Sequence, residues 1–367
     1  MINTDSKTTT TSIQKISVVL LGITLGWYCA ETPYINADIV AYTMSVFGIE
    51  NQDPNYLHRE GYAEVRKVAT DEQWNYIVAA NDKRKISASA EYGPKLVGEW
   101  RSKFMPRLAY IMPAYVLWKC GMNAALATCF VSAVCMGFCV WPMWILAGKG
   151  WRGLLGVAAI IFFWNMAYVG QKSTPGSMAC LLCLWSLVLA LRRSKWLLVL
   201  VVLAPLVRPD LIIFSGLILW WAGGKPEWKV AAGMLALLIA FGVSHLFGTP
   251  PWSASYYNYA CVPALGLPFA FMQRDAPAVT WDMYWLALYA RSPLLWMVHH
   301  TIMYWLITIL ALLIAKRDRL LLLGVPMAYF IIHFMVFPFI VPRFFIWVYI
   351  SGALVLLRES QCCLDKK

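Results

Sequence analysis

Long apolar segments separated by short polar stretches occupy most of the 367-residue chain. A helix needs about 20 apolar residues to cross the hydrocarbon core of a membrane, so segments near this length predict spanning helices. Ten crossings are assigned, at 16–31, 123–147, 153–170, 173–191, 196–207, 211–222, 230–247, 293–315, 320–341 and 342–357. The segments 196–207 and 211–222 are only 12 residues each, and they are counted as crossings because the charge pattern requires a turn between them. We therefore predict an all-α polytopic membrane protein with about ten transmembrane helices, in which residues 1–367 form a single membrane domain.

Two longer stretches interrupt this pattern. Residues 32–122 follow the first apolar segment, and residues 248–292 are rich in Pro, Tyr and Trp. We expect both to lie outside the bilayer. Within the first stretch, residues 106–118 form an apolar run that is short for a crossing, so we predict an interfacial or re-entrant helix there.

The middle of the first stretch predicts two short amphipathic helices. Residues 56–81 alternate apolar and charged positions and break at Ala69-Thr70-Asp71. Thr and Asp are good helix caps, so Thr70 or Asp71 is expected to begin the second helix.

Basic residues give the orientation, because Lys and Arg in short loops mark the cytoplasmic side. An even number of predicted crossings separates successive basic clusters, so all clusters and both termini are assigned to the cytoplasm. The clusters are Lys149 with Arg152, residues 192–195, Lys225 with Lys229, and residues 316–319. Residues 32–122 and 248–292 then lie on the extracytoplasmic side, and a bacterial inner-membrane protein is expected.

Composition excludes several other classes of protein. Hydrophobic residues make up 60% of the chain and charged residues only 14%, which lies outside the range of soluble domains. The net charge is +12, but the basic residues cluster at the ends of apolar segments. We assign them to topology and to contact with anionic lipids, and expect no nucleic-acid partner. The sequence contains no zinc spacing and no phosphate-binding glycine loop, so no metal or other cofactor is expected.

One apolar run, residues 196–222, contains Arg208, Pro209 and Asp210 side by side. Charged residues inside a membrane are costly and usually face a polar cavity, a partner or a substrate route. Pro209 disfavours helix at the preceding residue, so the chain is predicted to turn between two half-segments. We expect Arg208 and Asp210 at the outer side, on the rim of a water-filled cleft.

Asp38 lies early in the first outer stretch and is flanked by apolar residues. A carboxylate at a membrane surface is a candidate general base for activating a hydroxyl, and the alternative is a cap on a helix that begins there. Arg107, Arg208 and Arg343 are candidate phosphate ligands through their forked donors. The alternative for each arginine is contact with lipid headgroups.

Tyr256 and Tyr257 lie in the segment WSASYYNYACVPALG of the second outer stretch. Sugar faces stack on aromatic rings, so these tyrosines are candidate substrate-binding residues. An interfacial aromatic belt is the alternative interpretation.

The order of these features resembles the GT-C superfamily of polyprenyl-phosphate-dependent membrane glycosyltransferases. The features are an anchor segment, an outer loop with an early Asp, and the segments PRLAYIMPAYVLW, STPGSMACLLCLWSLVLALRRSKW and LAPLVRPDLIIFS. The resemblance runs from about residue 16 to 222 and more weakly to Arg343. It implies that Asp38 acts as base or organises the acceptor, and that Arg107, Arg208 and Arg343 hold the donor phosphate. Many members carry two adjacent acidic residues where this chain has Asp38 alone, so a metal-dependent reaction is not expected.

The expected function is therefore sugar transfer from a polyprenyl-phosphate-linked donor to a glycan, lipid or protein acceptor of the envelope. Two alternatives stay open. A lipid-linked glycan flippase or secondary transporter would also place Arg and Asp in broken helices, usually as paired breaks in two halves of a repeat. A non-catalytic membrane assembly protein would explain the amphipathic outer stretch, but not Asp38 and three arginines on one side.

Overall fold

The computed structural model describes residues 11–222, 224–270, 272, 275–293, 299–315, 317–338 and 342–364. The regular elements among these residues are all helices, and a single isolated bridge pairs Tyr34 with Lys172. The predicted all-α class is confirmed.

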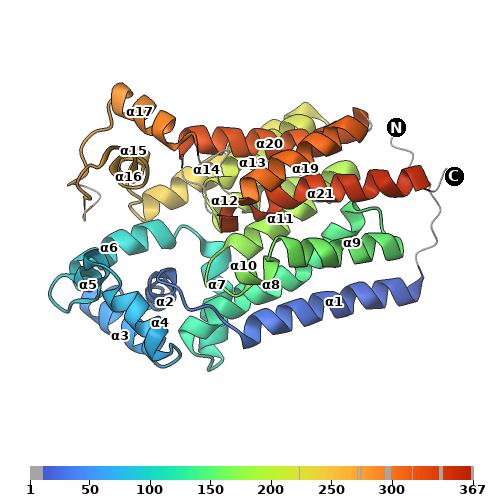
Figure 1. The fold of residues 1–367 in the computed structure, drawn as a ribbon. Coiled ribbons are helices and arrows are strands. Elements are labelled where there is room, and N and C mark those ends of the chain that lie inside the picture. Colours follow the sequence, from blue (N-terminus) through green and yellow to red (C-terminus); the bar gives the residue numbers. More distant parts are fainter. Residues whose placement is uncertain are drawn as a thin grey trace.

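Apolar helices form the body of the molecule (Figure 1). They are α1 (Ser12–Glu31), α8 (Ala124–Leu146), α9 (Gly150–Phe163), α10 (Met166–Gly170), α11 (Gly176–Leu191), α12 (Trp196–Val207), α13 (Leu211–Trp221), α14 (Pro226–Leu246), α19 (His299–Ile314), α20 (Arg317–Val336) and α21 (Pro342–Leu364). Within the described residues, three of these helices are long and apolar enough to cross a membrane: α1, α8 and α14. These helices and several shorter apolar ones support a membrane protein, and the number of ten crossings stays a prediction.

The two predicted outer stretches fold into short helices. The first contains α2 (Asp38–Phe47), α3 (Pro54–Arg66), α4 (Asp71–Ala79), α5 (Asp82–Ala88), α6 (Gly93–Phe104) and α7 (Leu108–Lys119), and the second α15 (Trp252–Tyr256), η1 (Tyr257–Cys261), α16 (Val262–Leu265) and α17 (Trp281–Arg291). Both stretches lie at one end of the helix bundle, opposite the start of α1 and the end of α21 (Figure 1). They touch directly, since the Thr249 hydroxyl donates to the carbonyl of Ser102 at 2.8 Å.

Local signals explain where the outer helices begin. The Thr70 hydroxyl accepts from the backbone N–H of Gln73, and the Gln73 side chain accepts from the Thr70 backbone, which completes a capping box. Asp53 caps α3 in a similar way, with Pro54 in the first turn. The predicted pair of amphipathic helices with a break before Asp71 is confirmed.

The helix break at Arg208 is also present. α12 ends at Val207, and Arg208 is extended with φ −154° and ψ 124° before α13 begins at Leu211. Pro209 is the cause, because its ring disfavours helical geometry at Arg208.

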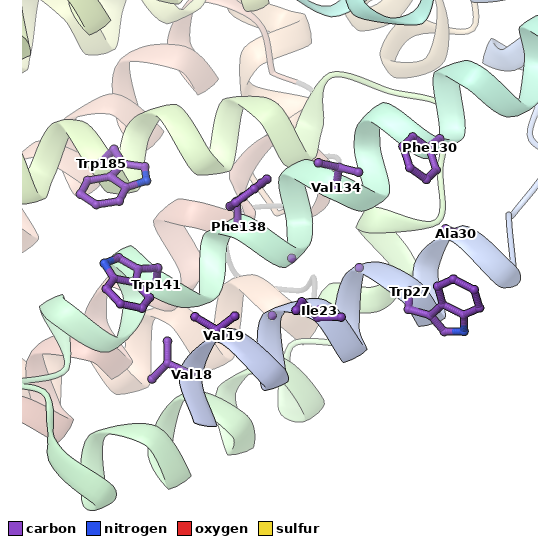
Figure 2. Close-up of a pocket in the computed structure, with 13 residues that line it drawn as sticks. Val18, Val19, Ile23, Trp27, Ala30, Phe130, Val134, Phe138, Trp141 and Trp185 are labelled. Atoms are coloured by element: carbon purple, nitrogen blue, oxygen red, sulfur yellow. The ribbon is translucent and has the colours of Figure 1, made fainter. Parts of the chain in front are cut away.

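α1 and α8 approach so closely that only glycine fits at their crossing. A Cβ atom on Gly22 would lie 2.8 Å from the carbonyl oxygen of Gly137, and one on Gly137 would lie 2.5 Å from that of Gly22. Small residues allow this packing in apolar helix pairs. Beside the crossing, side chains of α1 and α8, with Trp185 of α11, line an apolar groove of about 590 Å³ (Figure 2).

The arrangement of the outer helices supports a topology experiment. We expect single cysteines placed at the exposed positions Tyr92 and Trp281 to react with an impermeant thiol reagent from outside the cell, and a cysteine at Arg193 to react only after permeabilisation. Cys120 is exposed and would be replaced beforehand, together with Cys362 and Cys363. Labelling of Trp281→Cys only in permeabilised cells would place the second outer stretch in the cytoplasm and contradict the assigned orientation.

Candidate functional site

Asp38 is the first residue of α2, and its carboxylate faces the start of α21. The Asp38 Oδ2 atom lies 2.6 Å from Nη2 of Arg343, and the side chain of Asn36 donates to the same oxygen at 3.4 Å. Ala37 occupies the N-cap of α2, which has no side-chain cap hydrogen bond, so the interpretation of Asp38 as a capping residue is not supported. The side chains of Asp38 and Arg343 keep 30% and 20% of their surface accessible, so solutes can reach the pair.

Arg107 lies next to this pair. Tyr42, which is buried one turn after Asp38 on α2, accepts a hydrogen bond from Nη1 of Arg107. The guanidinium of Arg107 also lies over the ring of Phe104, 4.8 Å from its centroid. Rigid aromatic neighbours therefore fix the direction in which Arg107 points.

Arg208 and Asp210 form a two-pronged ion pair at the break between α12 and α13. Nη2 and Nε of Arg208 donate to the two carboxylate oxygens of Asp210 at 2.6 and 3.0 Å. The hydroxyl of Tyr329 donates to Asp210 at 2.8 Å, and Nε2 of His333 lies 3.4 Å from the same oxygen. Only 4% of the Arg208 side chain is exposed. The expectation that Arg208 stands on a water-exposed rim is wrong, because Asp210 neutralises its charge inside the bundle.

Phe344 connects the two ion pairs. The guanidinium of Arg208 lies 4.0 Å from the centroid of the Phe344 ring, and that of Arg343 lies 5.2 Å from it. Nη1 of Arg208 also donates to the Phe344 carbonyl at 3.5 Å. Asp38, Arg107, Arg208 and Arg343, which are far apart in sequence, are thus brought into one cluster at the end of the bundle that carries the outer stretches.

A pocket of about 380 Å³ opens beside Asp38, between the two outer stretches. We call it the polar pocket because five charged side chains are among its lining residues: Asp38, Lys83, Arg84, Glu99 and Lys103. Its lining includes Asp38, Lys83, Lys103, Asn258, Tyr259 and Phe269. Arg107, Arg208 and Arg343 stand behind Asp38 and do not line this pocket. The cluster therefore has two parts, a polar pocket and a group of arginines, with Asp38 in contact with both.

Half-buried lysines add positive charge around Asp38. Burial, and to a smaller extent Lys83, lower the pKa of Lys103 to about 8. Burial and the charge of Arg343 lower the pKa of Lys172 to about 8, while the charge of Asp38 opposes this shift. Near neutral pH both ammonium groups remain largely charged, so the surroundings of Asp38 favour an anionic ligand.

Tyr256 and Tyr257 do not line the pocket. Their side chains are buried in the second outer stretch, and their hydroxyls donate to the carbonyls of Tyr284 and Pro268, each at 3.0 Å. Their proposed contact with a sugar is corrected: the neighbouring Tyr259 is the tyrosine of this segment that faces the pocket.

Lys83, Lys103, Tyr259, Tyr329 and His333 were not among the candidate site residues predicted from the sequence. A buried histidine in an apolar run is a usable signal for a partner, and here the partner is Asp210. The lysines gave no such signal, because they resemble the solvated charges of any amphipathic helix.

Within the described residues, no group of three or more His, Cys, Asp or Glu side chains could hold a metal ion. Comparison of the chain with protein-family models, with curated proteins and with solved structures finds no match.

Proposed function

We propose that the protein is a membrane glycosyltransferase that moves a sugar from a polyprenyl-phosphate-linked donor to a glycan, lipid or protein acceptor on the extracytoplasmic side. One observation carries the proposal. Asp38 lies in the wall of a polar pocket and is paired with Arg343 at 2.6 Å, at the end of an apolar helix bundle. Asp38 can serve as the base, and Arg343 can contact the leaving phosphate. The apolar bundle beside them is suited to contact with the lipid part of the donor.

In the proposed reaction the acceptor hydroxyl oxygen forms a bond to the anomeric carbon of the sugar. The bond between that carbon and the phosphate oxygen breaks, and its electron pair leaves with the polyprenyl phosphate. The acceptor proton passes to Asp38, and Arg343 and Arg107 stabilise the departing phosphate. No metal is required for this balance of charge.

The Asp38–Arg343 pair suggests an order of binding. A donor phosphate competes with Asp38 for the guanidinium of Arg343, because both are anionic ligands of the same forked donor. Once Arg343 has turned to the phosphate, the carboxylate of Asp38 loses its counter-ion and accepts a proton more readily. Donor binding would thus prepare the base before the acceptor reacts.

A transporter for lipid-linked glycans is the alternative that one observation favours. Arg208, Asp210, Tyr329 and His333 form a charged network at a broken helix, which is a feature of transport sites. In this alternative the sugar stays on its lipid and the lipid changes leaflet.

The proposal is tested by following the lipid-linked sugar itself. We expect native mass spectrometry of the purified protein to detect a polyprenyl phosphate that carries one sugar, and incubation with an envelope fraction to transfer that sugar and leave the bare polyprenyl phosphate. Movement of the intact sugar lipid across proteoliposome membranes without transfer would contradict the enzyme and support the transporter.

A further inference from the structure

Two lysines of the first outer stretch point at one pair of aromatic rings from the second. The Nζ atom of Lys83 lies 3.8 Å from the ring centroid of Phe269 and 5.8 Å from that of Tyr259. The Nζ atom of Lys103 lies 5.2 Å from the Tyr259 centroid and 3.5 Å from the Tyr259 hydroxyl. Both lysines line the polar pocket beside Asp38.

The aromatic side of this pocket is held in place by Asn258. Its Nδ2 atom donates to the carbonyl of Ala270 at 2.9 Å, and its Oδ1 atom accepts from the Ala270 N–H at 3.0 Å. This double hydrogen bond fixes the residue next to Phe269. The rings are therefore a preorganised wall, and the lysines approach that wall from the other stretch.

Three other lysines of the same stretch have a carboxylate partner, whereas the described contact of Lys95 is the ring of Tyr92, at 4.9 Å. Lys67, Lys85 and Lys119 each form an ion pair with a glutamate or aspartate, at 2.6, 3.5 and 2.5 Å. Among the residues that the structure describes, neither Lys83 nor Lys103 has a carboxylate within ion-pair distance. The two lysines therefore face one pocket without a direct ion pair, although the charges of Glu99 and Asp38, which also line the pocket, act on Lys103 and Lys83 respectively.

Three cationic side chains, Lys83, Arg84 and Lys103, line the pocket together with two carboxylates, Asp38 and Glu99, so an excess of positive charge remains for an anion to offset. Aromatic faces attract ammonium groups only modestly, and two nearby ammonium groups repel each other. Burial and this repulsion lower the pKa of Lys103 to about 8. Burial and the charge of Arg84 lower the pKa of Lys83 to about 8, while the charge of Asp38 opposes this shift. An anion that contacts both lysines would remove the repulsion and keep both protonated.

We propose that the pocket binds a phosphate group carried by the acceptor, between Lys83 and Lys103, while Asp38 in the same wall receives the proton of the acceptor hydroxyl. This inference rests on the proposed sugar transfer. A phosphate fits better than a single hydroxyl-rich sugar, because its several oxygens can accept from two ammonium groups at once.

The test uses the full-length protein in nanodiscs of phosphatidylcholine, without donor, and glucose 6-phosphate as the probe. Binding is measured by calorimetry. We expect glucose 6-phosphate to bind more tightly than glucose, and Lys83→Gln and Lys103→Gln each to weaken its binding by about tenfold or more. The matched controls are Lys85→Gln on α5 and Lys95→Gln on α6, both exposed, which should change binding by less than about twofold.

A pH comparison gives a second readout. The phosphate monoester is dianionic at both pH 7.5 and 9.5, because its second pKa is about 6. Lys103 loses its charge as pH rises through about 8, so affinity should be highest below pH 8 and fall toward pH 9.5. The other charged or titratable groups of the pocket are Asp38, Lys83, Arg84, Glu99 and Tyr259. Burial raises the pKa of Tyr259 and keeps it neutral. The pKa of Lys83 is also lowered to about 8, so the comparison is repeated in Lys83→Gln, where the remaining pH dependence of binding is assigned to Lys103.

The outcomes are distinct. Equal affinity for glucose and glucose 6-phosphate in the wild-type protein would overturn the inference without any variant, and so would binding that neither lysine substitution changes. The lysines would then only hold Tyr259 and Phe269. Loss of probe binding in nanodiscs that contain phosphatidylglycerol would identify a lipid headgroup as the source of the phosphate. Tight phosphate binding without any sugar transfer would overturn the proposed function and leave the phosphate site standing.

Discussion

Asp38→Asn should lower sugar transfer by about 100-fold or more while donor binding persists. Asparagine keeps the shape of the side chain and its ability to accept hydrogen bonds, but it cannot take the acceptor proton. The substitution also removes the carboxylate that holds Arg343 at 2.6 Å. Donor affinity should therefore stay equal or rise, because the phosphate no longer competes with Asp38 for this guanidinium.

The measurement separates turnover from binding. Transfer of labelled sugar reports the chemical step, and retention of the lipid-linked donor on purified protein reports binding. Asp82→Asn is the control, because Asp82 lies on the same outer stretch with a 91% exposed side chain. A well-folded Asp38→Asn protein that transfers sugar at the wild-type rate would refute the catalytic role of Asp38.

Asp210→Asn should destabilise the protein by about 3–5 kcal/mol, as should Arg208→Ala. Arg208 is almost fully buried, and its two prongs end on Asp210 at 2.6 and 3.0 Å. Removal of either partner leaves the other charge, or its hydrogen-bond donors, without compensation inside the bundle. A double replacement by apolar residues, Arg208→Met with Asp210→Leu, should recover much of the lost stability, because no buried charge remains.

Thermal unfolding in detergent and the yield of folded protein measure this effect. Arg343→Ala is the matched comparison, because its ion pair with Asp38 is partly accessible and contributes little to stability. It should unfold near the wild-type temperature and bind donor about ten- to a hundredfold more weakly. If Arg208→Ala instead folds normally and loses donor binding, Arg208 contacts the substrate directly, as expected of the candidate phosphate ligand predicted from the sequence.

The sequence predicted those parts of the fold that local chemistry decides. Pro209 alone is enough to end a helix at Val207, and Thr70 with Gln73 is enough to begin one at Asp71. Apolar length located most helices of the bundle, but the segment predicted at 153–170 is divided into α9 and α10. Each signal lies within a few residues of the feature that it predicts.

The parts of the site that depend on long-range contacts were not predictable in this way. Lys103 and Tyr259 meet only because two separate outer stretches pack together. Within the second stretch, Tyr257 points into the core and Tyr259 lines the pocket. Composition cannot distinguish Tyr257 from Tyr259. Their different directions follow from the register of the π-helix η1, in which the Tyr257 hydroxyl donates to the carbonyl of Pro268.

The Asp38–Arg343 pair has a consequence for biosynthesis. Asp38 emerges from the ribosome early, just after α1, whereas Arg343 belongs to the first turn of α21, the last helix of the structure. A chain is made from its N-terminus at roughly 5–20 residues per second, so many seconds separate the synthesis of the two partners. Throughout that interval the carboxylate of Asp38 has no ion pair with Arg343. Until α21 has been made, Asp38 lacks this ion pair, and under the proposed function the leaving phosphate would lack Arg343.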